Sequence, residues 1–222
     1  MSGVPVPSAE EQATRRFLVE QLRRFYDRGW ISGTGGGICG PADGGHLLMA
    51  PTGVHKELVQ PDELFTIDPA DNAIVHAPAR AGLRPSECGP IFSLIARERG
   101  ARSVVHTHAL SAVLFGDLAE GGDLVTVSRL EMLKGVRGFA NTDTHDIPVI
   151  RNTPRELELV ENVARAIADP RFARTYAVVV EDHGVYAWGD DIWETKRHTE
   201  TYHFLFEATV ARHDRRREVP SR

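Results

Sequence analysis

The sequence predicts an α/β protein, built as a single α/β/α layered domain around a central mixed, largely antiparallel sheet. Long segments with helical periodicity lie near both ends of the chain. Between them are short apolar runs, such as 103–108, 147–150 and 176–180, which are rich in β-branched residues. Helices and strands do not alternate strictly, as they would around an all-parallel sheet, so we expect a mixed sheet.

The composition is that of one globular domain. The chain has 222 residues, of which 41% are hydrophobic and 26% charged, enough for one sizeable core. We expect a single domain over residues 1–222, with 1–7 as a loose leader and 214–222 as a tail. The net charge of −5 argues against nucleic acid as a partner, and no apolar run reaches the length of a membrane span. The two cysteines, Cys39 and Cys88, are too few for a disulfide framework and fit a cytoplasmic protein.

The first helix is predicted between Ser8 and Gly29. Ser8 and Glu11 have the spacing of a capping box, and Gly29 is a suitable helix terminator. The apolar positions between them recur at helical spacing and form one stripe. These positions are Leu18, Leu22, Phe25 and Tyr26.

The remaining elements follow from the same rules. Ser86 is a candidate N-cap for a helix that ends at Gly100. The segment Thr153-Pro154-Arg155-Glu156 has the residue types of a helix start, and a last helix begins near Asp190. A short helix is expected over 109–115. Strands are expected over 46–50, 64–68, 103–108, 124–127, 147–150, 176–180 and 185–188.

Three histidines have the placement of metal ligands. His106 and His108 are two residues apart, so their side chains project from the same face of a strand and can chelate one ion. His183, directly after the 176–180 strand, is the natural third ligand. Three protein ligands with an open fourth position are typical of catalytic zinc, so we expect one Zn²⁺ per subunit. The alternative is a pair of polar residues at a strand end and a histidine in a turn.

Two loops contain the residue types of a phosphate site. The segment Gly33–Gly37 can present backbone N–H groups to an anion, although by itself it could be a flexible turn. It is not placed like a dinucleotide site, because a helix precedes it and no helical pattern follows. Thr52, Gly53 and Lys56 offer a hydroxyl, an amide and an ammonium group to the same ligand.

Several segments together resemble the class II aldolase/adducin family, and the resemblance covers roughly Phe17–Val210. The resemblance implies a layered α/β fold, a small sugar-phosphate substrate, and zinc bound by the three histidines. It also implies a homotetramer with sites near the subunit interfaces. The segments that carry it are Gly33–Gly37, Ala50–Val54, His106–His108 and His183–Gly189.

One further segment separates functions within the family. Glu131-Met132-Leu133-Lys134-Gly135 resembles the dehydratases of the family rather than its aldolases, which implies that Glu131 is the general acid/base. By pattern alone Glu131 would be a solvent-facing residue on a helical turn. If it were buried, its pKa would rise to suit proton transfer. Glu87 is the alternative base, because an alignment shifted by one residue places it at the aldolase carboxylate.

The resemblance also implies a substrate pocket. Cys88 matches a pocket cysteine, although taken alone it could be a buried inert thiol. Gly37 stands where many aldolases of the family have asparagine, and Leu130 where close relatives often have glutamine. The implied substrate-binding residues are Cys88, Thr34, Gly35, Thr52, Gly53, Lys56 and Ser86.

Three interpretations of the function follow. The first is a zinc-dependent dehydratase that acts on a sugar phosphate. The second, a zinc-dependent sugar-phosphate aldolase or epimerase, shares the three histidines and differs in the bond that changes. The third is a metal-free binding module like the adducin heads, which the presence of all three histidines disfavours.

Overall fold

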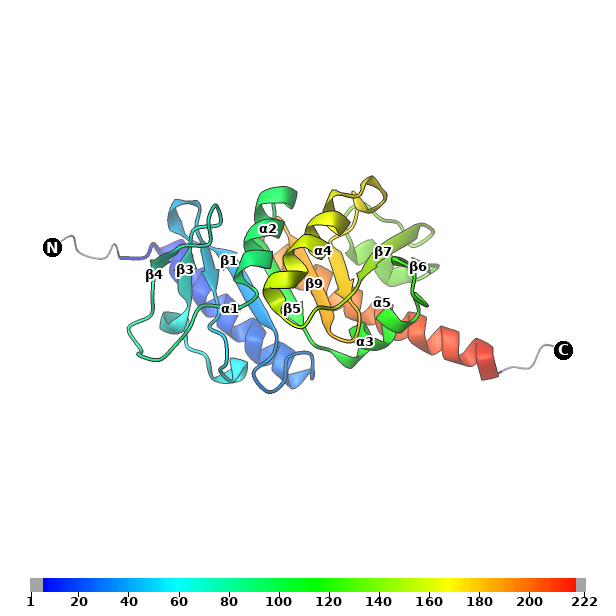
Figure 1. Cartoon of the computed structure of the whole chain (residues 1–222), viewed down its shortest axis with the longest axis horizontal. Helices are drawn as coiled ribbons and strands as arrows, with labels where there is room; N and C mark the ends of the chain where they lie inside the picture. The colour runs from blue at the N-terminus through cyan, green and yellow to red at the C-terminus, as the bar shows by residue number, and fades with distance from the viewer. Residues whose placement is uncertain (1–5, 219–222) are drawn as a thin grey trace.

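A nine-stranded mixed sheet forms the centre of the computed structural model, which describes residues 6–218 (Figure 1). The strand order is β4-β3-β2-β1-β5-β9-β8-β7-β6. Neighbouring strands are antiparallel except β7 and β8, which are parallel. The strands are β1 (Gly37–Pro41), β2 (Leu47–Met49), β3 (Phe65–Ile67), β4 (Ile74–His76), β5 (Ser103–Thr107), β6 (Leu124–Ser128), β7 (Thr144–Ile150), β8 (Ala177–Val180) and β9 (Gly184–Gly189).

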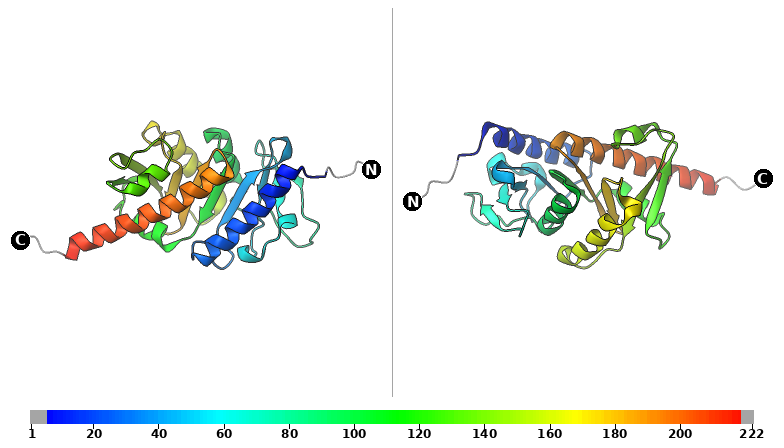
Figure 2. Two further views of the ribbon diagram at one scale, coloured as in Figure 1. Left: turned by 180° about the vertical axis from the view of Figure 1, so that it is seen from behind. Right: turned by 90° about the horizontal axis from the view of Figure 1, so that it is seen from above.

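Helices cover both faces of this sheet, which confirms the predicted layered fold (Figure 2). One layer contains α1, α3 and α5, and the other contains α2 and α4. Each layer buries the apolar side chains of alternate strand positions, as the pleat of a sheet requires. The helices are α1 (Ala9–Asp27), α2 (Gly89–Arg99), α3 (Leu110–Asp117), α4 (Glu156–Ala168) and α5 (Ile192–Glu218).

The start of α1 follows the predicted cap in part. The Ser8 hydroxyl accepts a hydrogen bond from the Glu11 amide at 3.1 Å. The Glu11 carboxylate does not return to the cap, because it accepts from Arg15 and from the Asp43 amide instead. One half of the capping box therefore fixes the helix, and the other half joins it to the β1–β2 connection.

Two helices begin later than the sequence predicted. The N-cap of α2 is Cys88, while the Ser86 hydroxyl accepts from the Cys88 amide at 3.2 Å. Helix α4 begins at Glu156, and Thr153 does not cap it. The Asn152 side-chain oxygen contacts the Thr153 amide at 2.9 Å and His183 at 3.2 Å, and Arg155 has extended backbone angles. These contacts hold the segment before α4 in an extended path beside the histidines.

Strand β1 was not predicted. The glycine-rich segment was expected to be a loop throughout, but Gly37 already pairs with His106 of β5. Glycine has low strand propensity, so the pattern carried no strand signal. Strand β4 was also missed, because its three residues lie at the exposed edge of the sheet, where alternation is weak.

The ends of the chain differ from the expected leader and tail. Helix α5 continues through three arginines to Glu218, so the expected tail is helical as far as the structure describes it. Basic side chains in the last turn favour this extension by opposing the helix dipole. Val6 and Pro7 have no regular structure, and 1–5 and 219–222 lie outside the described residues. None of the described helices combines the length and the apolar character needed to cross a membrane.

Candidate metal and substrate site

The three predicted ligands meet at one end of the central strands. His106 is in β5, His108 follows that strand, and His183 lies in the turn between β8 and β9. Because β5 pairs with β9, this turn folds back beside the end of β5. The Nε2 atoms of the three rings lie 2.9 Å (His106–His108), 3.0 Å (His108–His183) and 3.3 Å (His106–His183) apart.

The outer ring nitrogens orient two of these imidazoles. Nδ1 of His106 lies 3.1 Å from the Val185 carbonyl oxygen, and Nδ1 of His183 lies 3.2 Å from the side-chain oxygen of Asn152. Each Nδ1 therefore carries the proton, and each Nε2 presents its lone pair to the common centre. Burial and the neighbouring imidazoles lower the pKa of His108 to about 4 and hold the pKa of His106 well below its usual value. The neutral form that binds metal is thus present at pH 7.

The geometry fits a single metal ion. Ligand nitrogens about 2.05 Å from a tetrahedral ion are roughly 3.3 Å from one another, close to the spacing seen here. Two glycines leave the space that this arrangement of histidines needs. A Cβ at Gly35 would lie 2.5 Å from His108 Nδ1, and a Cβ at Gly184 would lie 1.9 Å from the Thr107 carbonyl oxygen. His106, His108 and His183 therefore form a candidate metal site, because their ligand atoms lie close enough together to hold one ion.

A cavity of about 1070 Å³ opens over the histidines. Its walls come from the loop before β1, the turn around Gly53, the loop before α2 and the segment before α4. It is lined by every predicted site residue except Lys56 and Glu131, and Glu87 also lines it. The predicted site residues on its wall are Thr34, Gly35, Thr52, Gly53, Ser86, Cys88, His106, His108 and His183.

Lys56 lies behind the cavity wall. Its side chain is 2% exposed, and its Nζ donates to the carbonyl oxygens of Thr34 (2.9 Å) and Val54 (3.3 Å). Burial lowers its pKa. The lysine therefore joins the two loops predicted to bind phosphate, rather than presenting its ammonium group in the cavity.

Glu131 lies outside the cavity of its own chain. It begins the short 3₁₀ helix η4 (Glu131–Gly135), and its carboxylate accepts hydrogen bonds from Lys134 and Asn141. These two donors, Lys134 first, lower its pKa, and the side chain is exposed. The burial that would raise the pKa is absent within the described chain, and the turn matches what the pattern alone indicated.

Sequence reasoning missed an acidic residue, Glu156, that lies beside the three histidines. Oε1 of Glu156 accepts from the Tyr186 hydroxyl at 2.6 Å and from the Cys88 thiol at 3.3 Å, and it lies 3.5 Å from His106 Nε2. The Tyr186 ring stacks on His106 with centroids 4.0 Å apart. Burial raises the pKa of the Tyr186 hydroxyl and of the Cys88 thiol, so both remain protonated donors.

Within this cluster, the sequence contains a signal for Tyr186 but none for Glu156. Glu156 was interpreted as part of a helix start, and its proximity to the site depends on a chain crossing that no local pattern encodes. Tyr186 was more accessible to prediction, because it pairs with His106 in adjacent antiparallel strands. Paired residues point to the same face of a sheet, so a strand after His183 places this ring against a ligand.

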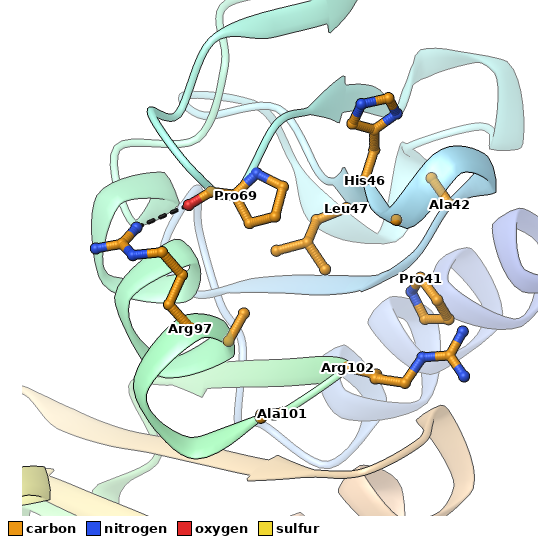
Figure 3. Close-up of a pocket in the computed structure, with 11 residues that line it drawn as sticks. Pro41, Ala42, His46, Leu47, Pro69, Arg97, Ala101 and Arg102 are labelled. Carbon is orange, nitrogen blue, oxygen red and sulfur yellow. Dashed lines mark hydrogen bonds between the residues drawn. The ribbon is translucent and has the colours of Figure 1, made fainter.

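A second cavity is separate from this centre. It has a volume of about 310 Å³ and lies between the β1–β2 connection and the end of α2 (Figure 3). Arg97 there donates to the Pro69 carbonyl oxygen at 2.7 Å, and the cavity shares no lining residue with the histidine site. We therefore place the chemistry in the larger cavity.

Comparisons with known proteins identify the family. Residues 16–210 match the family described as Class II Aldolase and Adducin N-terminal domain. The chain is 40% identical over 207 residues to methylthioribulose-1-phosphate dehydratase of Danio rerio, with 90% of this chain and 84% of that protein covered. It is 38% identical over 225 residues to the protein of the same name from Aspergillus fumigatus, with 94% and 91% covered.

Solved structures share the fold at lower identity. L-fuculose-1-phosphate aldolase from Thermus thermophilus has a TM-score of 0.67 at 19% identity, covering 94% of this chain and all (100%) of that chain. A sugar-phosphate aldolase from Thermotoga maritima has a TM-score of 0.66 at 17% identity, covering 92% and 96%. Because the family match spans most of the chain and the curated relatives are similar along most of their length, this protein belongs to the class II aldolase and adducin family.

Proposed function

We propose that this protein is a zinc-dependent dehydratase that converts 5-methylthioribulose 1-phosphate to 2,3-diketo-5-methylthiopentyl 1-phosphate in methionine salvage. The observation that carries the proposal is the convergence of His106, His108 and His183 inside a cavity whose wall also contains phosphate-type donors. The similarity to proteins named methylthioribulose-1-phosphate dehydratase points to the substrate.

The donor set favours zinc. Three neutral imidazoles leave one coordination position for a substrate oxygen, and imidazole is a good zinc ligand. A zinc ion held there, one per subunit, would supply Lewis-acid stabilisation to the charge that develops on the substrate carbonyl. The chain's own contribution is to fix two of the three rings, through Val185 and Asn152, before the substrate arrives.

The phosphate is placed at the other wall of the cavity. The Thr52 and Ser86 hydroxyls, the Gly53 amide and the loop containing Thr34 and Gly35 are the donors proposed for it. Binding the phosphate here fixes the position of the substrate carbons relative to the histidines. Cys88, on the same wall as Ser86, contacts the substrate beside Glu156 in this proposal.

Glu131 is the proposed proton-transfer residue. It takes the C3 proton and returns a proton to the departing C4 hydroxyl, so that water leaves and the enol product tautomerises to the diketone. Such proton transfer typically contributes about 10²–10⁴-fold to the rate. Because its carboxylate lies outside the cavity of its own chain, Glu131 reaches the site from a neighbouring copy. This requires an oligomer, and we propose a homotetramer.

Mixed oligomers test the shared site. His108→Ala and Glu131→Gln chains, each inactive alone, are co-expressed and purified as one assembly. Random mixing should restore up to about a quarter of the wild-type activity, because some sites then combine intact histidines with an intact glutamate. Mixtures that remain inactive would contradict a site shared between chains. A normal rate in the Glu131→Gln protein alone would move the base to Glu87.

A zinc-dependent sugar-phosphate aldolase or epimerase is the second candidate, because Glu87 lines the cavity of its own chain and the fold is shared with sugar-phosphate aldolases. Mass spectrometry of the products separates the candidates. Loss of one water supports the dehydratase, while release of dihydroxyacetone phosphate from ketose 1-phosphates supports the aldolase. A metal-free binding module is the least supported function, since all three histidines converge. A reducing cytoplasm is the proposed compartment, consistent with the two free cysteines of the described chain.

A further inference from the structure

We propose that Arg84 is the cation that binds the substrate phosphate, and that Lys56 is a buried support for the phosphate loops. This inference rests on the proposed sugar-phosphate substrate, and it names a residue that the sequence motifs did not indicate. It names the positive charge that balances the phosphate, because hydroxyl and amide groups carry none.

The backbone places Arg84 at the phosphate wall. Thr52 and Arg84 form an isolated antiparallel bridge, in which the Thr52 amide donates to the Arg84 carbonyl oxygen at 3.1 Å. The guanidinium group then lies against Gly53, where a Cβ would be 3.4 Å from Arg84 Nη2. The side chain lines the same cavity as the histidines. The two loops that carry Thr52 and Ser86 are thus joined at the residue that bears the charge.

The guanidinium group is available to a ligand. Within residues 6–218, the structure records no hydrogen bond from the Arg84 side chain, which is 69% exposed. Its nearest carboxylate is that of Glu87, at 4.0 Å from Nη1, and that side chain is 65% exposed. An exposed pair at this distance contributes little, so an incoming dianion can displace it.

The other cations near the cavity are already engaged. Lys56 gives two of its three N–H groups to the carbonyl oxygens of Thr34 and Val54, and it is almost completely buried. Arg155 lines the cavity too, but its Nε donates to Glu158 at 2.7 Å. Arg84 is therefore the cavity cation of the described chain whose donors remain free.

The two cations suit different tasks. A guanidinium group presents paired N–H donors that match two phosphate oxygens, and it remains protonated at any working pH. A buried ammonium group with fixed carbonyl partners is better suited to hold a loop. By fixing the Thr34 carbonyl, Lys56 orients the loop that places Thr34 and Gly35 on the cavity wall, while Arg84 supplies the direct contact.

Phosphate binding by the metal-loaded protein tests the assignment. Inorganic phosphate is titrated by calorimetry into wild type, Arg84→Met, Arg84→Lys and the control Arg155→Met. We expect Arg84→Met to bind phosphate about 10- to 100-fold more weakly, as for the loss of hydrogen bonds to a charged group. Arg84→Lys should recover part of this affinity, and Arg155→Met should stay within about twofold of wild type. The salt dependence of binding should be smaller in Arg84→Met.

Turnover gives an independent readout. The KM of Arg84→Met for the sugar phosphate should rise about 10- to 100-fold while kcat changes much less, because the lost contact is uniform binding. Thermal stability should be unchanged, since the side chain is exposed. Lys56→Met should instead lower the melting temperature, because it removes a buried ammonium group from two carbonyl partners.

The outcomes separate this inference from the proposed reaction. Phosphate affinity in Arg84→Met within twofold of wild type would overturn it, as would an equal loss in Arg155→Met. Lys56→Met with wild-type stability and the same loss of phosphate affinity as Arg84→Met would reverse the division between the two cations. If phosphate binding depends on Arg84 but the protein does not dehydrate methylthioribulose 1-phosphate, the proposed reaction fails and the phosphate assignment stands.

Discussion

Two groups of histidines on opposite sides of β5 differ in what their ring nitrogens face. The Nε2 atoms of His106, His108 and His183 face one another at 2.9–3.3 Å, and no arrangement of protons satisfies all three contacts at once. On the other side, His203 has Thr107 at 3.0 Å and Ser111 at 3.1 Å from its two nitrogens. Facing lone pairs therefore indicate a candidate metal site, and nitrogens that each have a hydrogen-bond partner indicate a structural histidine.

The same contrast holds for His198, which is equally buried. Its Nδ1 lies 2.7 Å from the Trp188 carbonyl oxygen, and its Nε2 accepts from the Arg137 amide at 3.2 Å. His203 also stacks on Trp30 with ring centroids 4.1 Å apart. Burial alone does not distinguish His106 from His198 and His203, because all three side chains are buried and burial lowers the pKa of each. The partners of each nitrogen do distinguish them.

Removal of one ligand should have the largest effect. His108→Ala leaves two imidazoles, so the protein should lose its metal and its activity together. Metal content by mass spectrometry on protein purified without a histidine tag, alongside the rate of water loss, checks this. A metal-free His108→Ala protein with full activity would end the metal hypothesis.

Removal of a structural histidine should affect stability instead. His203→Ala leaves a cavity beside Trp30 and two hydroxyls without their partner, which should lower the free energy of unfolding by about 2–4 kcal/mol. Metal stoichiometry should remain one per chain. Urea denaturation of the metal-free variant measures the free energy of unfolding. A loss of metal equal to that of His108→Ala would show that the two groups are not distinct.

An intermediate effect is expected at a residue that orients a ligand. Asn152→Ala removes the acceptor from His183 Nδ1 and should weaken metal affinity by about 10- to 100-fold, with the ligand set intact. Competition with a chromophoric chelator measures this. Asn162→Ala is a matched control, because this half-buried asparagine of α4 donates to the Arg151 carbonyl oxygen and contacts none of the three histidines. Unchanged affinity in Asn152→Ala would show that this contact does not tune the metal centre.

A gradual effect is expected from pH. Burial lowers the pKa of His145 to about 4 and of His203 to about 3, against 6.5 for unperturbed histidine. Between these values the unfolded chain binds more protons than the folded chain. The stabilisation from these two histidines is therefore fully present above pH 6.5 and is lost as the pH drops toward 4. For each histidine, the free energy of unfolding falls by up to about 1.4 kcal/mol per pH unit.

Chemical denaturation of metal-free protein from pH 7.5 to 5 tests this dependence. His203→Gln should show a shallower fall than wild type, because one titrating group is gone. Metal must be absent, since its release on acidification would add a slope of its own. An identical slope in the two proteins would assign the dependence to other groups.

Local rules predicted most of the fold. The strands that carry the histidines and the helices that cover them were identified from apolar periodicity and caps. The rest depended on tertiary contacts. β1 begins within a glycine-rich segment that has no strand propensity, and it forms because β5 lies beside it. Helix α4 starts at Glu156 because Asn152 holds the preceding residues next to His183.

The site was predicted in part for a related reason. Ligand spacing at i and i+2 is local, so His106 and His108 were identifiable, and the residues of the phosphate loops line the cavity as expected, apart from Lys56. The burial of Lys56 and the exposure of Arg84 depend on how the loops pack against one another. From the sequence pattern alone, Lys56 was the expected cation for the phosphate. Glu156 lies at the site because the fold brings the start of α4 next to His106, which is distant in the sequence. The proposed role of Glu131 involves a second chain. Sequence spacing encodes none of these.

Metal titration tests the central claim most directly. The protein is stripped with a chelator, dialysed, and assayed for loss of water from methylthioribulose 1-phosphate as zinc is added back. We predict no turnover without metal and a rate that rises linearly to a plateau at one zinc per chain. A stripped protein that retains the full rate, with its metal content verified as negligible, would contradict the proposed zinc-dependent dehydration.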